Sequence, residues 1–297
     1  MRQWAKTTEG ETMDAYALAE RIAAGDRFQD LTRPTKSLAK NSHYRIWRDG
    51  TTVLLKVYGT PARERRESHA ITALGDLECI PVRLDGSSDE EPAWALFEDP
   101  GQWSLASLPG NSEAARKAGA VLRSVHESDP SALTNLTRGI DNEWIQVDFA
   151  STIRRLARYR RRVGIDSDLY DAMAAVTPPR ASEPRAAHTD PTPEHFVLDE
   201  SGGVTLVDWE WATLAPPEWD LSKAAWLLRA RSGSESAAAL QDGYGEVLDP
   251  IEMSRWIIYH AAMLLIFEAE QRMSNAGADS YSDTVAEILR VLEVAAS

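Results

Sequence analysis

The sequence predicts an α+β protein of two lobes, in which a small β-rich lobe precedes a larger, mainly helical one. Residues 43–59 and 80–99 contain short runs rich in β-branched and aromatic residues, which favour strands. Beyond a segment rich in Gly, Pro and Ser at residues 98–110, apolar residues recur at helical spacing. A length of 297 residues suits two lobes or one large domain, because single cores stop growing at about 250 to 300 residues.

The first lobe is predicted to combine helices with paired strands. Asp49 and Gly50 separate two runs of β-type residues, and Asp-Gly in that position is a strong hairpin signal. Pro61 stands near the start of the next helical pattern, where its fixed φ suits the first turn. The predicted elements are a helix at 13–25, strands at 43–47 and 51–59, a helix at 61–78, and strands at 80–86 and 91–99.

The second lobe is predicted to be mostly helical. The Gly- and Pro-containing segment is the best linker candidate, so we place the boundary near residues 98–103 and divide the chain into 1–98 and 99–297. The sole strand signals after it are residues 195–199 and 203–209, which form a hairpin with Gly at its turn. The predicted helices cover residues 112–128, 144–163, 169–176, 216–232, 234–248, 251–273 and 281–297.

Composition limits the classes of partner. A net charge of −14 argues against nucleic acid and is a weak hint of a cationic small substrate. Cys79 is the single cysteine and the N-terminus lacks a signal-peptide pattern, so we expect a cytoplasmic protein without a disulfide. The apolar run at 256–267 is shorter than the roughly 20 residues of a membrane span, so no membrane is expected. A monomer and a homodimer both remain open.

Four charged residues fall in the order that phosphoryl transfer requires. That chemistry needs positioned charges around a nucleotide, a metal and a hydroxyl. Lys56 lies in a predicted strand, where a kinase places the lysine that holds the α- and β-phosphates. Glu67 follows on the next helix as its partner, with Glu64 as a rival on the same helical face. Asp190 precedes the late hairpin and Asp208 ends it, eighteen residues further on.

These residues lie in stretches that resemble the aminoglycoside phosphotransferase family, part of the protein-kinase-like group that includes choline and macrolide kinases. Residues 188–195, "HTDPTPEH", resemble the family's H-G-D-x-x-x-x-N catalytic stretch, and 207–210, "VDWE", resemble its I-D-W/F-E metal motif. Similarity extends to "APPEWDL" at 215–221, and covers roughly residues 30–270. The resemblance implies a bilobal protein-kinase-like fold whose first lobe, 1–98, binds the nucleotide.

The resemblance also implies roles for single residues. Asp190 would orient the acceptor hydroxyl and take its proton, and Asp208 would hold Mg²⁺ against the phosphates of ATP or GTP. Lys56 and Glu67 would form the phosphate-binding pair. The remaining implied residues are Leu96, Phe97 and Glu98 at the hinge beside the nucleobase, and His188 and Asp220 as structural support of the catalytic loop.

Two positions depart from the family pattern. His195 stands where the second metal ligand is an Asn; it either binds the metal, as a His at that place in macrolide kinases allows, or caps the strand through a hydrogen bond. The loop expected to cover the phosphates has no glycine before Gly50, so its polar residues would have to serve instead. These residues are Ser37, Lys40, Asn41 and Ser42.

The acceptor is expected to be a small, cationic hydroxyl compound such as an aminoglycoside or a related antibiotic. A cluster of carboxylates near the catalytic loop would attract ammonium groups. A metabolic kinase for choline, a sugar or an amino alcohol shares the same motifs. A non-catalytic module that binds a nucleotide or a small molecule would explain the missing loop glycines and the His at position 195. The candidate acceptor residues are Glu210, Glu218, Asp141, Glu143, Trp144 and Asp148.

Overall fold

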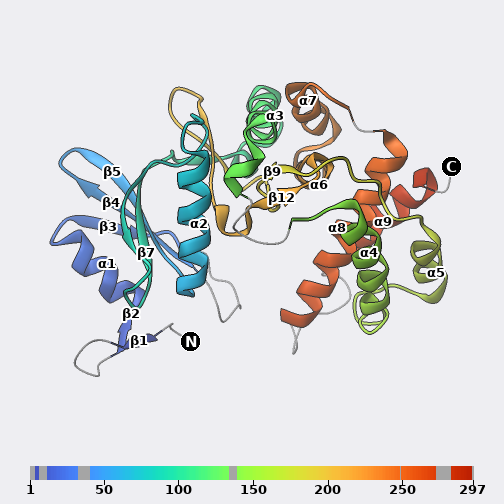
Figure 1. Ribbon diagram of the computed structural model, residues 1–297, viewed down its shortest axis with the longest axis horizontal. Helices are drawn as coiled ribbons and strands as arrows, with labels where there is room; N and C mark the ends of the chain where they lie inside the picture. The colour runs from blue at the N-terminus through green and yellow to red at the C-terminus, as the bar shows by residue number, and fades with distance from the viewer. Residues whose placement is uncertain are drawn as a thin grey trace.

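The computed structural model describes residues 4–6, 12–32, 41–133, 139–247, 249–271 and 282–295. It has a sheet-containing N-terminal part and a helical C-terminal part, which lie side by side along the long axis of the molecule (Figure 1). The predicted α+β class is therefore confirmed. The predicted division between residues 98 and 99 stays a prediction. Ser37 and Lys40 of the predicted phosphate loop lie outside the described residues.

The N-terminal part is built on a five-stranded antiparallel sheet in the order β3-β4-β5-β7-β6. Its centre is the predicted hairpin, in which Asp49 and Gly50 both take positive φ, at 50° and 79°. Positive φ at both central residues is what a two-residue hairpin turn needs, and Gly adopts it without a steric penalty. The strands are β3 (Arg27–Asp30), β4 (Ser42–Arg48), β5 (Thr51–Val57), β6 (Arg83–Ser87) and β7 (Trp94–Glu98), and a separate pair is β1 (Trp4–Lys6) with β2 (Thr12–Asp14).

Two helices cover opposite faces of this sheet. Helix α1 (Ala15–Ala23) packs on the face that includes Leu55 and Leu96, whereas α2 (Pro61–Leu74) packs on the face that includes Phe97. Because successive side chains of a strand point to opposite faces, Leu96 and Phe97 belong to different cores. Figure 1 shows α2 between the sheet and the helical part, so residues of α2 reach the junction of the two.

The C-terminal part contains more strand than predicted. The predicted hairpin is present as β10 (Phe196–Leu198) and β11 (Val204–Leu206). The prediction that these are the sole strands of this half was wrong, because three further short strands pair with neighbours that are distant in sequence. They are β8 (Trp103–Ser104), β9 (Arg185–Ala187) and β12 (Thr213–Ala215), and β9 leads directly into the predicted catalytic loop.

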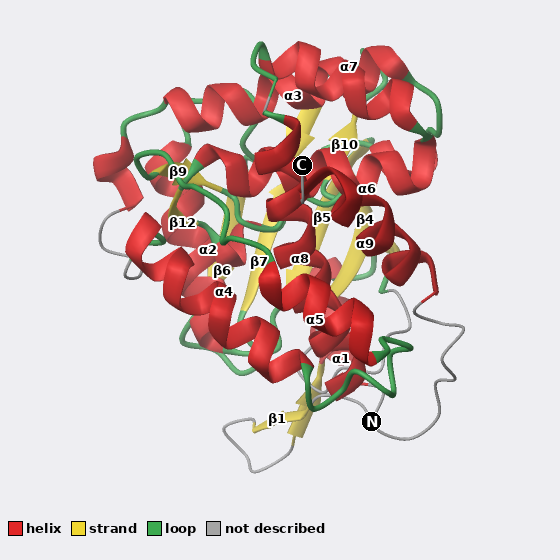
Figure 2. Cartoon of the chain, turned by 90° about the vertical axis from the view of Figure 1, so that its right-hand side faces the viewer, coloured by secondary structure: helices red, strands yellow, loops and turns green. Residues whose placement is uncertain are grey.

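Helices make up the rest of the C-terminal part (Figure 2). The helix predicted through residue 163 ends at Leu156, and turns follow it. Gly119 and Gly243 let two helices approach closely, since a Cβ on either would overlap a carbonyl oxygen of the other helix. The helices are α3 (Ser112–Glu127), α4 (Asn142–Leu156), α5 (Ser167–Ala175), α6 (Pro217–Ser232), α7 (Ser234–Tyr244), α8 (Pro250–Gln271) and α9 (Ser282–Ala295), with short 3₁₀ turns at Leu105–Ser107, Pro130–Leu133 and Trp209–Trp211.

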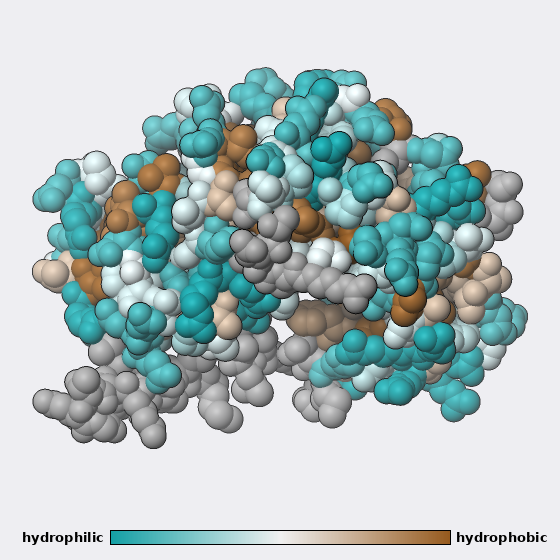
Figure 3. Space-filling view, viewed as in Figure 1, coloured by the Kyte–Doolittle hydropathy of each residue, from teal (hydrophilic) through white to brown (hydrophobic). Residues whose placement is uncertain are grey.

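Hydrophilic residues cover much of the face in Figure 3, and hydrophobic residues are also visible in the hollow near its centre. In the described part of the chain, every helix is too short or too polar to cross a lipid bilayer.

Candidate active site

A cavity of about 1240 Å³ lies between the sheet and the helical part. Strands β4, β5 and β7 contribute to one side, and the loop after β9, the turn after β11 and helices α6 and α8 contribute to the other. The four charged residues that the sequence places in the order of phosphoryl transfer line it together, although they are far apart in sequence. These are Lys56, Glu67, Asp190 and Asp208.

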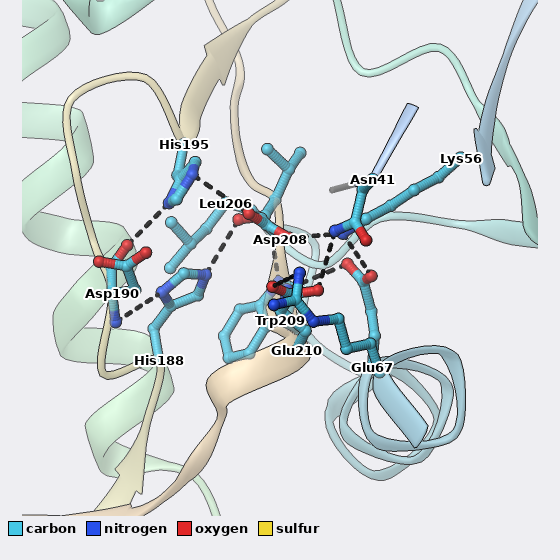
Figure 4. A network of polar contacts seen from close by, with 12 residues as sticks. Asn41, Lys56, Glu67, His188, Asp190, His195, Leu206, Asp208, Trp209 and Glu210 are labelled. Atoms are coloured by element: carbon cyan, nitrogen blue, oxygen red, sulfur yellow. Dashed lines mark hydrogen bonds and ion pairs between the residues drawn. The ribbon is translucent and has the colours of Figure 1, made fainter. Parts of the chain in front are cut away.

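Lys56 forms two ion pairs, one within the N-terminal part and one to the C-terminal part (Figure 4). Its Nζ lies 2.6 Å from Oε2 of Glu67 on α2 and 2.5 Å from Oδ1 of Asp208 after β11. The predicted rival Glu64 instead pairs with Arg83 at 2.9 Å. The geometry therefore pairs Glu67, and not Glu64, with Lys56.

Burial and charge oppose each other in this cluster. Burial alone would lower the pKa of Lys56, but the carboxylates of Asp208 and Glu67 raise it above its ordinary value. Burial raises the pKa of Glu67, and the Lys56 ammonium opposes that rise. Burial would also raise the pKa of Asp208, yet Lys56 and His195 hold it well below its usual range. Asp208 is therefore an anion at neutral pH.

The backbone turns sharply at Asp208. Its φ of 72° lies in the left-handed region, which is uncommon for residues other than Gly but is tolerated by Asp. The next residue, Trp209, donates its backbone N–H to Oε1 of Glu67 at 3.0 Å, and its indole N–H to the Leu206 carbonyl at 2.6 Å. These bonds join the turn to Glu67, which is the α2 partner of Lys56, so the Asp208 carboxylate has a defined position.

His195 lies between the two predicted catalytic carboxylates (Figure 4). Its Nδ1 is 2.7 Å from the backbone carbonyl of Asp190, and its Nε2 is 3.3 Å from Oδ2 of Asp208. A carbonyl oxygen only accepts, so Nδ1 carries a proton and donates it to Asp190, while Nε2 faces the Asp208 carboxylate. The capping and metal-binding interpretations of His195 use different nitrogens and are compatible.

Asp220 and His188 hold the loop that carries Asp190. The carboxylate of Asp220 accepts the backbone N–H groups of His188 and Thr189, each at 2.8 Å, and contacts His126. Burial would raise the pKa of Asp220, but the hydrogen bond with His126 and the charges around it lower the pKa. Burial lowers the pKa of His188 to about 4, so its neutral ring donates from Nε2 to a carbonyl and accepts the Asp190 N–H at Nδ1.

Lys223 is a site residue that the sequence interpretation missed. Its Nζ lies 2.6 Å from Oδ1 of Asp190, and both side chains are partly exposed to the cavity. Lys223 is on α6, three residues after Asp220, so both residues lie on the helical face toward the loop. That spacing, added to the predicted role of Asp220, is a signal that could have identified it.

Only some of the residues predicted to bind the nucleotide face the cavity, because side chains alternate along a strand. Phe97 lines the cavity, whereas the side chains of Leu96 and Glu98 are not part of its lining. Ser42 is also outside the lining, although its neighbours Asn41 and His43 contribute to it. Because side chains alternate along a strand, β4 presents the residues on either side of Ser42 to the cavity.

Most of the predicted acceptor residues lie elsewhere. Glu210 lines the cavity, but it is buried and bonded to Asn41 at 2.8 Å and to Arg63 at 3.3 Å. The other five are not in the cavity lining, and most of them make contacts elsewhere in the helical part. Asp141 caps α4, Trp144 packs on Trp219, Asp148 accepts from Tyr259 and Thr152, Glu218 accepts from Ser182, and Glu143 is exposed in the first turn of α4.

The donor set suits a magnesium ion that phosphates help to bind. Mg²⁺ prefers oxygen ligands, which Asp208 supplies through Oδ2, and it completes its shell with water and phosphate oxygens; Nε2 of His195 lies 3.3 Å from that carboxylate oxygen. In the described ranges there is no group of three or more His, Cys, Asp or Glu side chains that could hold a metal ion by itself.

The chain is similar to known phosphotransferases in sequence and in fold. Residues 32–256 match the phosphotransferase enzyme family. A search among curated proteins gave no match. The fold matches a spectinomycin phosphotransferase in complex with ADP and spectinomycin, at a TM-score of 0.66 with 14% identity over 96% of this chain and 98% of that one.

Two further solved structures extend the comparison. A choline/ethanolamine kinase family protein from Mesorhizobium loti gives a TM-score of 0.63 with 19% identity over 94% of this chain and 100% of that one. A macrolide 2′-phosphotransferase from Brachybacterium faecium gives 0.65 with 15% identity over 90% and 97%. The predicted protein-kinase-like fold of small-molecule phosphotransferases is thereby confirmed.

Proposed function

The chain belongs to the phosphotransferase enzyme family, and from that premise we propose that it transfers the γ-phosphoryl group of ATP or GTP to a hydroxyl of a small molecule. The observation that carries the proposal is the position of Lys56, paired with Glu67 and Asp208 in the same cavity as Asp190. A buried, permanently charged lysine beside an acidic metal ligand is the arrangement that binds nucleotide phosphates.

The nucleotide would lie on the sheet side of the cavity. Phe97 would pack against the nucleobase, with the backbone of Leu96 and Glu98 forming the hinge. Lys56 would donate to the phosphates, held in place by Glu67. When bound, Mg²⁺ would neutralise phosphate charge, with Asp208 and His195 as its protein ligands.

Asp190 would act on the acceptor hydroxyl. Within the described chain its Oδ1 is held by Lys223, and its Oδ2 has no protein hydrogen-bond partner, so Oδ2 can accept the hydroxyl proton. The acceptor oxygen would form a bond to the γ-phosphorus as the bond from that phosphorus to the β,γ-bridging oxygen breaks. The proton passes to Asp190, and ADP or GDP is the leaving group.

We propose a hydroxyl of a small molecule as the acceptor, and no narrower class of compound. The names of structural relatives include both antibiotic phosphotransferases and a choline/ethanolamine kinase family protein. Four of the five predicted acceptor carboxylates that motivated the cationic class lie outside the cavity lining.

Nucleotide stabilisation and phosphate transfer test the proposal together. We expect Mg-ATP or Mg-GTP to raise the melting temperature, because a ligand at a hundredfold excess over its Kd stabilises by about 2.7 kcal/mol. Transfer from γ-labelled nucleotide would be measured with aminoglycosides, macrolides and amino alcohols. Asp190→Asn should keep the nucleotide-dependent shift and lose transfer, whereas the exposed control Asp199→Asn should keep both.

Two results would refute the proposal. One is the absence of stabilisation by either nucleotide at millimolar concentration. The other is undiminished transfer by Asp190→Asn to any acceptor, since that would remove Asp190 from the chemistry.

A further inference from the structure

The acceptor side of the cavity is formed mainly by apolar side chains. Helices α6 and α8 present Trp226, Leu227, Met263, Leu264 and Phe267 to it, and we call these five residues the acceptor wall. Met263, Leu264 and Phe267 follow the i, i+1, i+4 spacing of one helical face. Phe267 is 56% exposed, which is high for a large apolar side chain. The wall therefore leaves apolar surface that a bound molecule would remove from water.

Carboxylates of the cavity are already neutralised. Each Asp or Glu in its described lining has a basic partner within ion-pair distance, so little uncompensated negative charge faces a ligand. The pairs are Glu67 and Asp208 with Lys56, Asp99 with Arg45, Asp190 with Lys223, Glu194 with Arg231, and Glu210 with Arg63.

Lys223 compensates the charge of Asp190 where the acceptor must bind. Its ammonium lies 2.6 Å from the oxygen of Asp190, and its distance from the Thr189 carbonyl is 3.5 Å. An acceptor hydroxyl that reaches Asp190 also approaches this ammonium. A compound with several ammonium groups near its hydroxyl would therefore find no uncompensated carboxylate there.

His260 supplies a neutral polar atom behind the wall. Burial lowers its pKa to about 3, and its Nε2 lies 3.1 Å from the Trp219 carbonyl. Nε2 also lies 3.1 Å from the Ser222 hydroxyl, so both protein contacts of the ring are made by this nitrogen. The buried Nδ1 has no protein partner among the described residues. A few polar atoms in an apolar lining are typical of sites that bind small organic molecules.

We infer that the acceptor is a hydroxyl compound with a large apolar body and at most one positive charge. Its hydroxyl would reach Asp190, and its apolar body would cover the acceptor wall on α6 and α8. The inference rests on the proposed function for the position of the hydroxyl. It narrows the cationic class that the acidic composition suggested, because net charge of the whole chain does not describe the lining of this cavity.

A fluorescent probe tests the wall without knowledge of the natural acceptor. The probe is 8-anilinonaphthalene-1-sulfonate, an anion with an apolar aromatic body, titrated into the full chain in the presence of Mg-ADP. Three variants each place a carboxylate on an apolar position: Leu264→Asp and Phe267→Asp in the wall, and Val147→Asp on the exposed surface of α4 as control. Melting temperatures verify folding, and Phe267→Asp serves if Leu264→Asp does not fold.

We expect the wild-type chain to bind the probe, and the folded wall variants to bind it at least about tenfold more weakly, a difference of about 1.4 kcal/mol. Val147→Asp should bind as the wild type does, and equimolar kanamycin, a polycation, should not displace the probe. Absence of binding, equal affinity in all folded variants, or displacement by kanamycin would overturn the inference. Mg-ADP stabilisation in the same samples reports separately on the proposed function.

Discussion

Replacing Glu67 by Gln tests the role of the buried lysine pair, and Glu64→Gln provides a matched control. Both glutamates are 2% exposed, both lie on α2, and each forms an ion pair. Glu67 pairs with Lys56 inside the cavity, whereas Glu64 pairs with Arg83 outside its lining. The two substitutions therefore remove the same charge from similarly buried positions on one helix, but only one of them changes the proposed phosphate site.

The stability cost follows from what each partner retains. Leaving a buried charge without any partner costs about 3–5 kcal/mol. Lys56 keeps Asp208 at 2.5 Å after Glu67→Gln, so we expect only the loss of a hydrogen bond to a charged group, about 1.5–3 kcal/mol. Arg83 is partly exposed, and Glu64→Gln should cost no more than this. Denaturant titration measures the free energy of unfolding of both variants.

Nucleotide binding separates the two variants. Glu67→Gln should weaken Mg-ATP binding at least about tenfold, because Lys56 loses the contact that holds it toward the phosphates. Glu64→Gln should bind Mg-ATP as the wild type does. If calorimetric titration gave Glu67→Gln wild-type affinity, or Glu64→Gln an equal loss, the assignment of Glu67 to the phosphate site would be wrong.

Stability should also respond to pH and to helix packing. The pKa of His188 is near 4 in the folded chain and near its ordinary 6.5 in the unfolded one. Unfolding therefore takes up a proton at pH values between these two. The free energy of unfolding falls as the pH drops from 6.5 toward 4, by up to about 1.4 kcal/mol per pH unit. Urea titrations at pH 7, 6 and 5 should show a smaller slope in His188→Gln, while the exposed control His69→Gln keeps it; an identical slope in both would contradict this. Gly119→Ala should lower the free energy of unfolding by about 1–3 kcal/mol, because the added Cβ would meet the α7 backbone. This cost should exceed the gain from the better helix propensity of Ala. The exposed control Ala120→Ser should change the free energy of unfolding by no more than about 0.5 kcal/mol. Thermal or chemical unfolding checks this, and a stabilised Gly119→Ala would refute the close approach.

Local signals predicted the parts of the fold that local chemistry determines. Asp49 and Gly50 indicated their hairpin because both residues tolerate positive φ. Short strands such as Arg185–Ala187 were missed because three residues carry no readable period, and they pair only through distant partners. The end of α4 at Leu156 was missed since the Arg-rich residues after it are good helix formers.

The site was predictable where the family pattern specifies a residue and not where strand register decides. Lys56, Glu67, Asp190 and Asp208 come together as the resemblance implied. Ser42 was assigned to the nucleotide site without knowledge of the strand register, and the alternation of side chains along β4 leaves it outside the cavity lining.

The acceptor acids were misplaced for a different reason. Asp141 carries a readable N-cap signal, an Asp directly before a helical pattern, which favours a capping role over a ligand role. Asp148 binds Tyr259 of α8, a tertiary contact that the sequence does not reveal.

The central claim is that the Lys56–Asp208 cluster binds a magnesium–nucleotide complex. Calorimetric titration of Mg-ATP or Mg-GTP into the wild type, Asp208→Asn and the exposed control Asp199→Asn tests it most directly. We expect the wild type and the control to bind, and Asp208→Asn to bind at least about tenfold more weakly. A wild-type chain that binds neither nucleotide, or an Asp208→Asn variant that binds as tightly as the wild type, would contradict it.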